Sequence, residues 1–294
     1  MSLFDDLEKS INYIEENIKE KITLDDIAKH LFSSKYHFHR IFKVITNQKL
    51  MEYVRMRKLS LSLNDLMYTD LTIEDIALDF GFEHVQSYNR SFKKTFGISP
   101  SQFRLEKRQL PIVDKLDLKS IMGLESGIIV SPYFVIKPEF YIVGIKHQLL
   151  VSENYQKNLA NQLAKDFFYN YRKKIIGSIN PDLLISFSTY TDITSNESIY
   201  MPALQVSHLN DIPKGMCGEK IKAHKYGIFK YIGSHSADAI TFKILGNIYT
   251  HIYTWLLHSQ YVQDGSFHFE MIDIKLSKDN YCEADIYIPI KAKE

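Results

Sequence analysis

The sequence TLDDIA at residues 23–28 returns as TIEDIA at residues 72–77, and these two stretches decide the fold of the first third of the chain. An arginine-bearing segment follows each of them, RIFK at residues 40–43 and RSFK at residues 90–93. In each copy, a capped helix is therefore expected before an amphipathic helix that carries an arginine. The repeat predicts two consecutive helix-turn-helix units and indicates DNA as a partner.

Length and composition limit the number of domains and the class of protein. A chain of 294 residues suggests two domains, or three small ones, and its 45% hydrophobic and 24% charged content is ordinary for a globular protein. The formal net charge of +1 gives no global basic field. However, six of the seven arginines lie before residue 109 and only Arg172 lies after it. Arginine suits guanine edges and phosphates, so this skew favours nucleic-acid contact in the first third.

Nothing in the sequence predicts export or membrane insertion. The start, MSLFDDLEK, is acidic and lacks the basic and apolar regions of a signal peptide, and no apolar run approaches the ~20 residues of a membrane span. Cys217 and Cys282 are far apart and show no metal-ligand spacing, so we expect buried thiols in a reducing cytosol. We therefore expect a cytoplasmic protein with no cofactor, no metal and no membrane partner.

Hydrophobic periodicity divides the chain into three parts. Residues 1–108 predict roughly seven helices, residues 109–135 are interpreted as a linker, and residues 136–294 predict a second domain. In that domain the order strand, helix, strand, strand occurs twice, first over residues 140–207 and then over residues 219–290. The fold class predicted is multidomain: an all-α double helix-turn-helix domain, then an α+β domain of duplicated β-α-β-β units.

Several short motifs occur together in residues 23–104. They are Ile27-Ala28, YHFHRIFK at residues 36–43, RMRKL at 55–59, Ile76-Ala77, Gly81-Phe82, YNRSFKKTFG at 88–97 and PSQFR at 100–104. This segment closely resembles the DNA-binding domain of AraC/XylS-family transcription regulators. The resemblance implies that each module lays one recognition helix in the major groove, about one DNA turn from the other. One polypeptide could then read two successive grooves of double-stranded DNA, and RNA polymerase is an expected partner.

The resemblance also implies the DNA contacts. The residues matching base-contact positions are Tyr36, Arg40, Gln86 and Arg90, and the lysines suited to phosphate contacts are Lys43, Lys93 and Lys94. Tyr36 departs from the tryptophan common in similar relatives, and Val85 replaces a polar residue, which suggests contact with a thymine methyl or weaker readout. The two modules differ in these residues, so an asymmetric DNA site is expected. The plain alternative is that the exposed arginines are only solvated. His37, His39 and His84 are expected to be surface or packing residues rather than metal ligands.

The second half carries shorter motifs. They are Val143-Gly144-Ile145, KYGIFKYIG at residues 225–233, YTWLL at 253–257, Phe269-Glu270 and IYIPI at 286–290. This half resembles the gyrase-inhibitor-like effector domain and the sensing domain of multidrug-responsive activators. The order of the domains, DNA-binding part first, resembles that of Rob-type regulators.

Glu270 is the central residue of the predicted ligand site. It interrupts the apolar strand FHFEMI at residues 267–272, and alternation places it on one face with His268 and Ile272. A buried carboxylate needs a partner, and an organic cation would serve, with cation–π attraction from the aromatic side chains of Trp255 and Tyr231. The resemblance implies that Glu270 occupies the family's pocket-glutamate position. The predicted ligand-binding residues are Glu270, Trp255, Tyr231 and Tyr287.

Two plainer interpretations remain at this point. Glu270 could lie on an exposed edge or bond to a neighbouring tyrosine, and Trp255 could be ordinary core.

The sequence as a whole predicts a DNA-binding transcription regulator that senses a small lipophilic or cationic organic ligand. We expect an activator of transcription, and we do not expect an enzyme. One alternative is a C-terminal domain that hydrolyses small molecules. Against it, Glu270 has no second acid on the same face of its strand, since Asp273 faces the other way. The other alternative is a protein-interaction module without a ligand.

Overall fold

The computed structural model describes residues 3–31, 35–46, 48–106, 109–116, 118, 121–190 and 196–293, and for residues 35–37 it describes the backbone only. The chain divides into two compact units, Leu3–Lys119 and Ser120–Glu294. In the described part of the chain, no helix combines the length and the apolar character that a membrane span requires.

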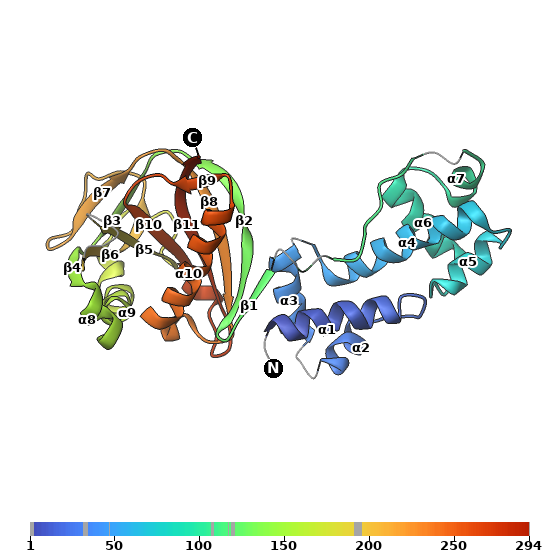
Figure 1. Ribbon diagram of the computed structural model, residues 1–294, viewed down its shortest axis with the longest axis horizontal. Coiled ribbons are helices and arrows are strands. Elements are labelled where there is room, and N and C mark those ends of the chain that lie inside the picture. The colour runs from blue at the N-terminus through green and yellow to red at the C-terminus, as the bar shows by residue number, and fades with distance from the viewer. Residues whose placement is uncertain are drawn as a thin grey trace. The chain divides into compact units, whose positions relative to one another are not determined.

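The first unit is helical (Figure 1). In chain order, its helices are α1 (Leu3–Glu16), α2 (Leu24–His30), α3 (Lys35–Thr46), α4 (Leu50–Tyr68), α5 (Ile73–Asp79), α6 (Val85–Phe96) and α7 (Pro100–Glu106). Thr23 and Thr72 each form a capping box with the aspartate three residues on, so the predicted repeat begins both modules in the same way. Gly97 ends α6 in the left-handed conformation.

The long helix α4 is shared by the two modules. Its Tyr53 lies in the core with Phe42 of α3, and its Leu59, Leu63 and Leu66 pack against Ile76 of α5 and the buried face of α6. Helices α2 and α5 bury the matched pairs Ile27-Ala28 and Ile76-Ala77. The alternation of apolar and polar positions in the sequence therefore predicts which face of each short helix is inside.

The second unit is a curved antiparallel sheet with helices against one face (Figure 1). Within the described residues, the strand order is β1-β2-β8-β11-β10-β5-β6-β3-β7, with β4 paired to β6 and β9 to β11. The strands are β1 (Ile121–Leu124), β2 (Gly127–Lys137), β3 (Phe140–Gly144), β4 (His147–Leu150), β5 (Leu183–Tyr190), β6 (Glu197–Val206), β7 (Cys217–Ile221), β8 (His224–Gly233), β9 (Tyr261–Gln263), β10 (Phe267–Asp273) and β11 (Cys282–Ala292). The helical segments are α8 (Val151–Lys157), α9 (Leu159–Asp166), a π turn (Phe167–Tyr171), three 3₁₀ turns (Arg172–Lys174, Ala237–Ala239 and Ile274–Leu276) and α10 (Phe242–His258).

The predicted duplication is present in the order of the strands. Strands β3, β5 and β6 belong to the first β-α-β-β unit, and β8, β10 and β11 belong to the second. The two units meet where β5 pairs with β10 at the centre of the sheet, with β6-β3 continuing on one side and β11-β8 on the other. The ligand-site strand of the sequence prediction is therefore a central strand, not an exposed edge.

Two predicted elements differ in detail. The helix predicted for the first β-α-β-β unit is interrupted at Asn158, which takes the left-handed conformation with φ 52° and separates α8 from α9. Asparagine reaches that conformation more easily than most residues, so it can end one helix and begin the next. The first strand predicted for the second β-α-β-β unit, beginning at residue 219, is in fact two strands, β7 and β8, joined by residues 222–223.

The linker predicted over residues 109–135 forms hydrogen bonds near both of its ends. Near its start, Val113 donates its backbone N–H to Ser60 Oγ of α4 at 2.9 Å, and Leu116 donates to Tyr53 OH at 3.0 Å. Near its end, β2 pairs with β8 along most of its length. Gly123, Gly127 and Pro132 of this stretch lie in the β1-β2 hairpin, where turns and irregular pairing favour such residues, whereas Pro111 precedes the hairpin.

Candidate functional site

The second recognition helix, α6, has two distinct faces. Tyr88, Phe92 and Phe96 are buried against α4 and α7, and Tyr88 OH lies 2.9 Å from Ser62 Oγ of α4, which holds the helix in place. Its opposite face exposes four of the predicted DNA contacts. These are Gln86, Arg90, Lys93 and Lys94. The predicted contacts of the second module therefore lie together on one accessible helix face.

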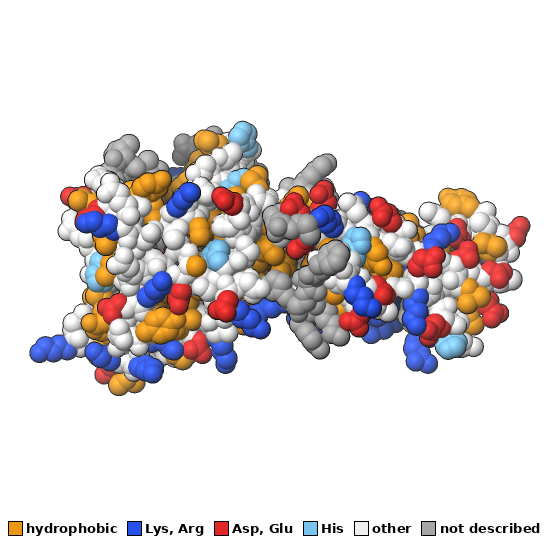
Figure 2. Space-filling model, turned by 90° about the horizontal axis from the view of Figure 1, so that it is seen from below, with side chains coloured by type: hydrophobic (Ala, Val, Ile, Leu, Met, Phe, Trp, Pro, Cys, Tyr) orange, Lys and Arg blue, Asp and Glu red, His pale blue; other side chains and the backbone are white. Residues whose placement is uncertain are grey.

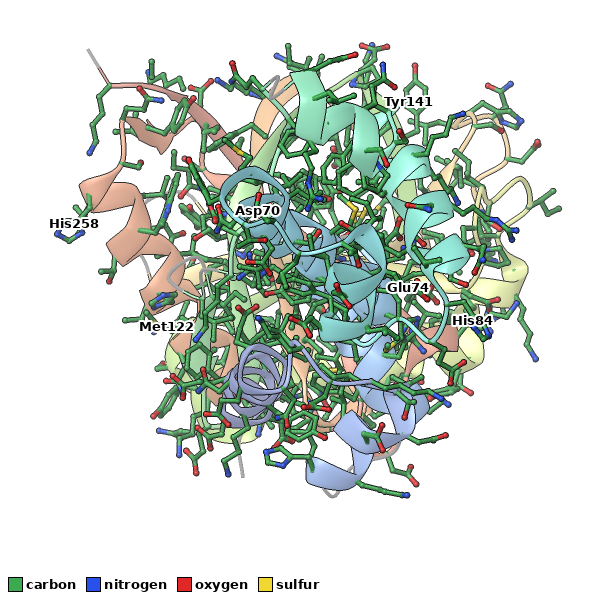
Figure 3. The ribbon with its side chains drawn as sticks, turned by 90° about the vertical axis from the view of Figure 1, so that its right-hand side faces the viewer. Asp70, Glu74, His84, Met122, Tyr141 and His258 are labelled. Carbon is green, nitrogen blue, oxygen red and sulfur yellow. The ribbon has the colours of Figure 1, made fainter. Side chains whose placement is uncertain are left out.

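Outside α6, the second module also exposes acidic side chains. Asp70 before α5 and Glu74 on α5 are exposed, as is His84 before α6 (Figure 3). On the face of the molecule drawn in Figure 2, acidic and basic side chains are interspersed over the helical unit. Phosphate binding needs a concentration of positive charge, so α6 is the part of this module suited to DNA.

The first recognition helix, α3, shows the same arrangement where its side chains are described. Phe38, Ile41 and Phe42 are buried, Arg40 is half-buried and Lys43 is exposed. The side chain of Tyr36 lies outside the described residues. The sequence pattern therefore places Arg40 and Arg90 at equivalent positions of two helices whose inner faces are apolar.

Lys58 of α4 joins the two modules, and the sequence analysis did not single it out. Its ammonium group is buried and donates to the backbone carbonyls of Glu20, in the turn after α1, and Phe80, at the end of α5, at 2.5 and 2.8 Å. Burial lowers the pKa of Lys58 to about 8. Gly81 approaches the same turn so closely that a Cβ there would lie 2.5 Å from the Glu20 carbonyl oxygen, and its φ is +69°. Both features fix the turn of one module against the turn of the other.

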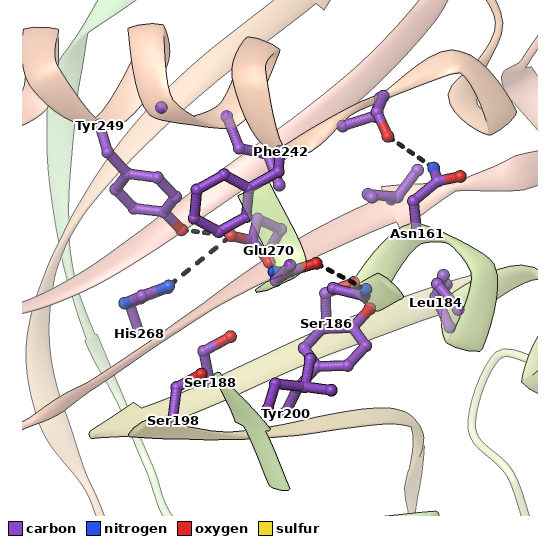
Figure 4. Close-up of a pocket in the computed structure, with 18 of the residues that line it drawn as sticks. Asn161, Leu184, Ser186, Ser188, Ser198, Tyr200, Phe242, Tyr249, His268 and Glu270 are labelled. Carbon is purple, nitrogen blue, oxygen red and sulfur yellow. Dashed lines mark hydrogen bonds and ion pairs between the residues drawn. The ribbon is translucent and has the colours of Figure 1, made fainter. Parts of the chain in front are cut away.

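A cavity of about 550 Å³ lies in the second unit, between the sheet and its helices. Its floor is formed by β5, β6 and β10, and its walls by α8, α9 and α10 (Figure 4). Glu270 and His268 line it together with Ile272, so the alternation predicted for β10 is confirmed. Lys165 of α9 and Asp238 of the 3₁₀ turn before α10 also line the cavity.

Glu270 is buried at the cavity floor, with 4% of its surface exposed. Tyr249 of α10 donates a hydrogen bond to the Glu270 carboxylate, and His268 Nε2 lies 3.9 Å from Glu270 Oε1. Burial raises the pKa of Glu270 to about 7, although the Tyr249 hydroxyl opposes that shift. Burial also lowers the pKa of His268 to about 4, so this imidazole is neutral near pH 7. Among the described residues, no charged cation forms an ion pair with this carboxylate.

The three other predicted ligand residues do not line this cavity. Trp255 packs edge-on against Phe229 with ring centroids 5.4 Å apart, in the core between α10 and the sheet. Tyr231 is buried in the same core and donates to the Ser126 carbonyl at 2.9 Å. Tyr287 stacks on Phe269 at 4.6 Å, in the aromatic cluster on the opposite face of the sheet. Tyr231 is buried, Trp255 and Tyr287 are half-buried, and none of the three faces the cavity.

Residues that the sequence analysis did not assign to the ligand site complete the cavity. Tyr249 and Tyr253 come from one face of α10, where their spacing of four residues was the only available signal. Ser186 Oγ of β5 lies 3.2 Å from Tyr200 OH of β6. Asn161 of α9 donates to the Ile240 carbonyl at 2.5 Å, which holds α9 against the segment before α10 (Figure 4).

The comparisons with known proteins agree with this division. Residues 131–291, more than half of the chain, match the GyrI-like small molecule binding domain. The chain belongs to that family. Residues 27–106 match a helix-turn-helix domain, and this combination is that of an AraC-type regulator of the Rob type. The chain is 41% identical over 93 residues to the transcriptional activator AarP of Providencia stuartii, covering 32% of this chain and 69% of AarP.

Two further relatives extend the match. The chain is 39% identical over 98 residues to YbfP of Bacillus subtilis, a transcriptional regulator, covering 33% of each protein. It is 36% identical over 159 residues to the right origin-binding protein of Escherichia coli, covering 54% of each. The chain therefore spans only about a third of YbfP and about half of the origin-binding protein. The protein is a DNA-binding transcription regulator with a GyrI-like small-molecule binding domain.

Proposed function

We propose that the GyrI-like unit senses a lipophilic organic cation and that its occupancy changes transcription from promoters bound by the helical unit. One observation carries the proposal: Glu270 is buried, faces a cavity of about 550 Å³ and has no charged partner among the described residues. A buried carboxylate is costly unless a cation compensates it. A ligand with a positive charge and an apolar body would supply that cation and fill the rest of the cavity.

The structure of the cavity supports a binding site. Most of the remaining lining is apolar, for example Phe168 of the π turn and Phe242 and Leu245 of α10. Small-molecule sites are commonly concave, mostly apolar and supplied with a few polar groups. A ligand that binds one conformation of this unit more tightly than another would shift the population towards that conformation.

DNA readout is proposed for the two recognition helices. Tyr36 and Arg40 would contact bases in one major groove, and Gln86 and Arg90 would contact bases in the next. Lys43, Lys93 and Lys94 would bind phosphates. Because the two modules carry different side chains, the bound site would be asymmetric. We further propose an activator that contacts RNA polymerase, in keeping with the name of the relative AarP.

A crossed experiment tests both halves. The full chain, Arg90→Ala and Glu270→Gln are each titrated with a duplex selected by the full chain from a random pool, and with dodecylammonium or dodecyltrimethylammonium. Arg90→Ala should weaken DNA binding by about 5- to 150-fold and leave the amphiphiles unaffected, because one bidentate base contact is worth about 1–3 kcal/mol. Glu270→Gln should retain DNA binding and lose the amphiphile. Equal affinity of wild type and Glu270→Gln for both amphiphiles would remove the proposed sensing role.

A further inference from the structure

Residues 110–116, which we call the strap, follow α7 and run back along α4 (Figure 1). The hydrogen bonds of the strap to Ser60 and Tyr53 of α4 are joined by a third, because Arg57 Nη1 donates to the Val113 carbonyl at 2.5 Å. Tyr53, Arg57 and Ser60 are spaced by four and then three residues, so they form one stripe along the helix. All three are buried. The strap therefore bonds to every position of a buried polar stripe.

The strap spans both helix-turn-helix modules. At its start, Leu110 packs against the core of the second module. At its end, Leu116 bonds to Tyr53, whose ring packs against Phe42 of the recognition helix α3. Between Ser60 and Tyr53 the helix α4 advances about 10 Å, and three residues of extended chain cover the same distance. The strap is therefore matched in length to the part of α4 along which it binds.

The chain continues from the strap into the β1-β2 hairpin, which begins at Ile121, five residues after Leu116. Leu124 of β1 and Ile129 of β2 belong to a core cluster that also contains the buried face of α10. Tyr249 and Tyr253 of α10 pack against the same cluster and line the cavity. One packed core therefore connects a wall of the cavity with the hairpin that continues the strap.

Resting on the proposed sensing function, we infer that the strap carries the effect of ligand binding to the two recognition helices. A ligand in contact with Tyr249 and Tyr253 favours one packing of α10 against the β1-β2 hairpin, and the hairpin then tightens or loosens the strap. Movement of the strap along α4 changes the spacing of the recognition helices, and with it the affinity for two successive major grooves.

Two sites are coupled through an element whose arrangement both of them bias, and the strap is that element. Tyr53, Arg57 and Ser60 are thereby positioning residues for DNA readout, because they act through the strap. An effect of this kind appears in the ratio of DNA affinities with and without ligand. A purely structural effect lowers both affinities equally and leaves the ratio unchanged.

The test measures this ratio in the full chain. Binding to a duplex selected by the full chain from a random pool is titrated with and without dodecylammonium, below its micellar concentration. The ligand should change the DNA affinity of the wild type by at least about fivefold. Insertion of Gly-Ser-Gly-Ser between residues 119 and 120 adds up to about 13 Å of slack and removes no described contact of the strap or the hairpin. The insertion variant should respond by less than about twofold, while its affinity for each ligand alone stays at the wild-type value.

A second variant releases the strap from α4. Tyr53→Phe/Ser60→Ala removes both hydroxyl groups that accept from the strap, and its response should also fall below about twofold. Lys115→Ala is the matched control, because it removes only an exposed bond of the strap, from Lys115 to Asn12 at 2.9 Å. The control for the insertion places the same four residues after Gly215, in the exposed turn between β6 and β7. Both controls should respond as the wild type does.

The outcomes separate the strap from the sensing function. A response of wild-type size in the insertion variant, or in the double variant once thermal unfolding has shown it to be folded, would overturn the role of the strap and leave the sensing function standing. Binding of dodecylammonium to the wild type without any change in DNA affinity would also overturn that role. If dodecylammonium does not bind the wild type, the proposed function itself fails.

Discussion

Lys58 in the helical unit and Glu270 in the sheet unit are both buried, and among the described residues neither has an ion-pair partner at hydrogen-bonding distance. Their surroundings satisfy the two side chains in opposite ways. Lys58 in the helical unit donates to two backbone carbonyls, one from each helix-turn-helix module. Glu270 in the sheet unit accepts from Tyr249 and otherwise faces a cavity. Burial lowers the pKa of Lys58 to about 8 and raises the pKa of Glu270 to about 7. In both groups it therefore favours the neutral form.

The different surroundings of Lys58 and Glu270 indicate different roles for the two charges. The bonds of Lys58 are made entirely within the fold, so its charge stabilises the junction of the two modules. The carboxylate of Glu270 is only partly compensated, so its charge is available to a ligand. A perturbed pKa alone does not separate a structural group from a binding group; the surroundings of the group do. Three predictions test this contrast.

The largest expected effect is on the junction. Lys58→Met should destabilise the helical unit by about 2–4 kcal/mol, because two buried carbonyls lose their donor, at a cost of about 1–3 kcal/mol each, while the removal of a desolvated charge offsets part of the loss. Hydrogen exchange of the α4 and α6 amides reports this unit separately. Fluorescence of Trp255, the only tryptophan of the chain, reports the other unit and should be unchanged.

The matched control for that substitution is Lys21→Gln. Lys21 pairs with Glu83 at the same junction at 2.5 Å, but both side chains are exposed. Exposed ion pairs contribute little, so no measurable change in protection is expected. Equal exchange in Lys58→Met and wild type would contradict the structural role of the buried lysine.

A smaller effect, of opposite sign, is expected for Glu270→Gln. The folded-state pKa of Glu270 is raised, so the folded chain binds more protons than the unfolded chain between about pH 4.5 and about pH 7, and stability falls as pH rises through that window. Glutamine keeps the acceptor for Tyr249 without the charge. At about pH 8 the variant should therefore be more stable than wild type by about 1–3 kcal/mol. Urea unfolding followed by Trp255 fluorescence measures this difference, and a destabilised variant would show that the carboxylate serves the fold.

The sequence was sufficient for the architecture because its signals are local. Capping boxes, helical stripes and turn glycines predicted the helix-turn-helix repeat, and the change to alternating strands predicted the β-α-β-β units. Alternation within β10 also placed His268, Glu270 and Ile272 on one face. These features depend on residues close together in the chain.

The lining of the cavity could not be read in the same way. Trp255, Tyr231 and Tyr287 are as aromatic as Tyr249, yet only Tyr249 among them faces the open space. Which aromatic side chains pack and which remain accessible depends on the position of α10 over β10, and so on contacts between distant segments. Lys58 was missed for the same reason, since its partners lie 38 and 22 residues away.

The central claim is that the Glu270 carboxylate binds the positive charge of a ligand. The number of protons released on binding tests this claim most directly. Dodecylammonium is titrated calorimetrically into the full chain in two buffers of different ionisation enthalpy, at about pH 6 and about pH 8.5. The tyrosines around Glu270 remain neutral over this range, because burial raises the pKa of Tyr200, Tyr249 and Tyr253. His268 also remains neutral, because burial lowers its pKa. Binding should release close to one proton at the lower pH and almost none at the higher pH, with affinity rising up to about tenfold per pH unit below about pH 7. Glu270→Gln should release none. Binding to wild type with the same affinity and no proton release at both pH values would contradict the account.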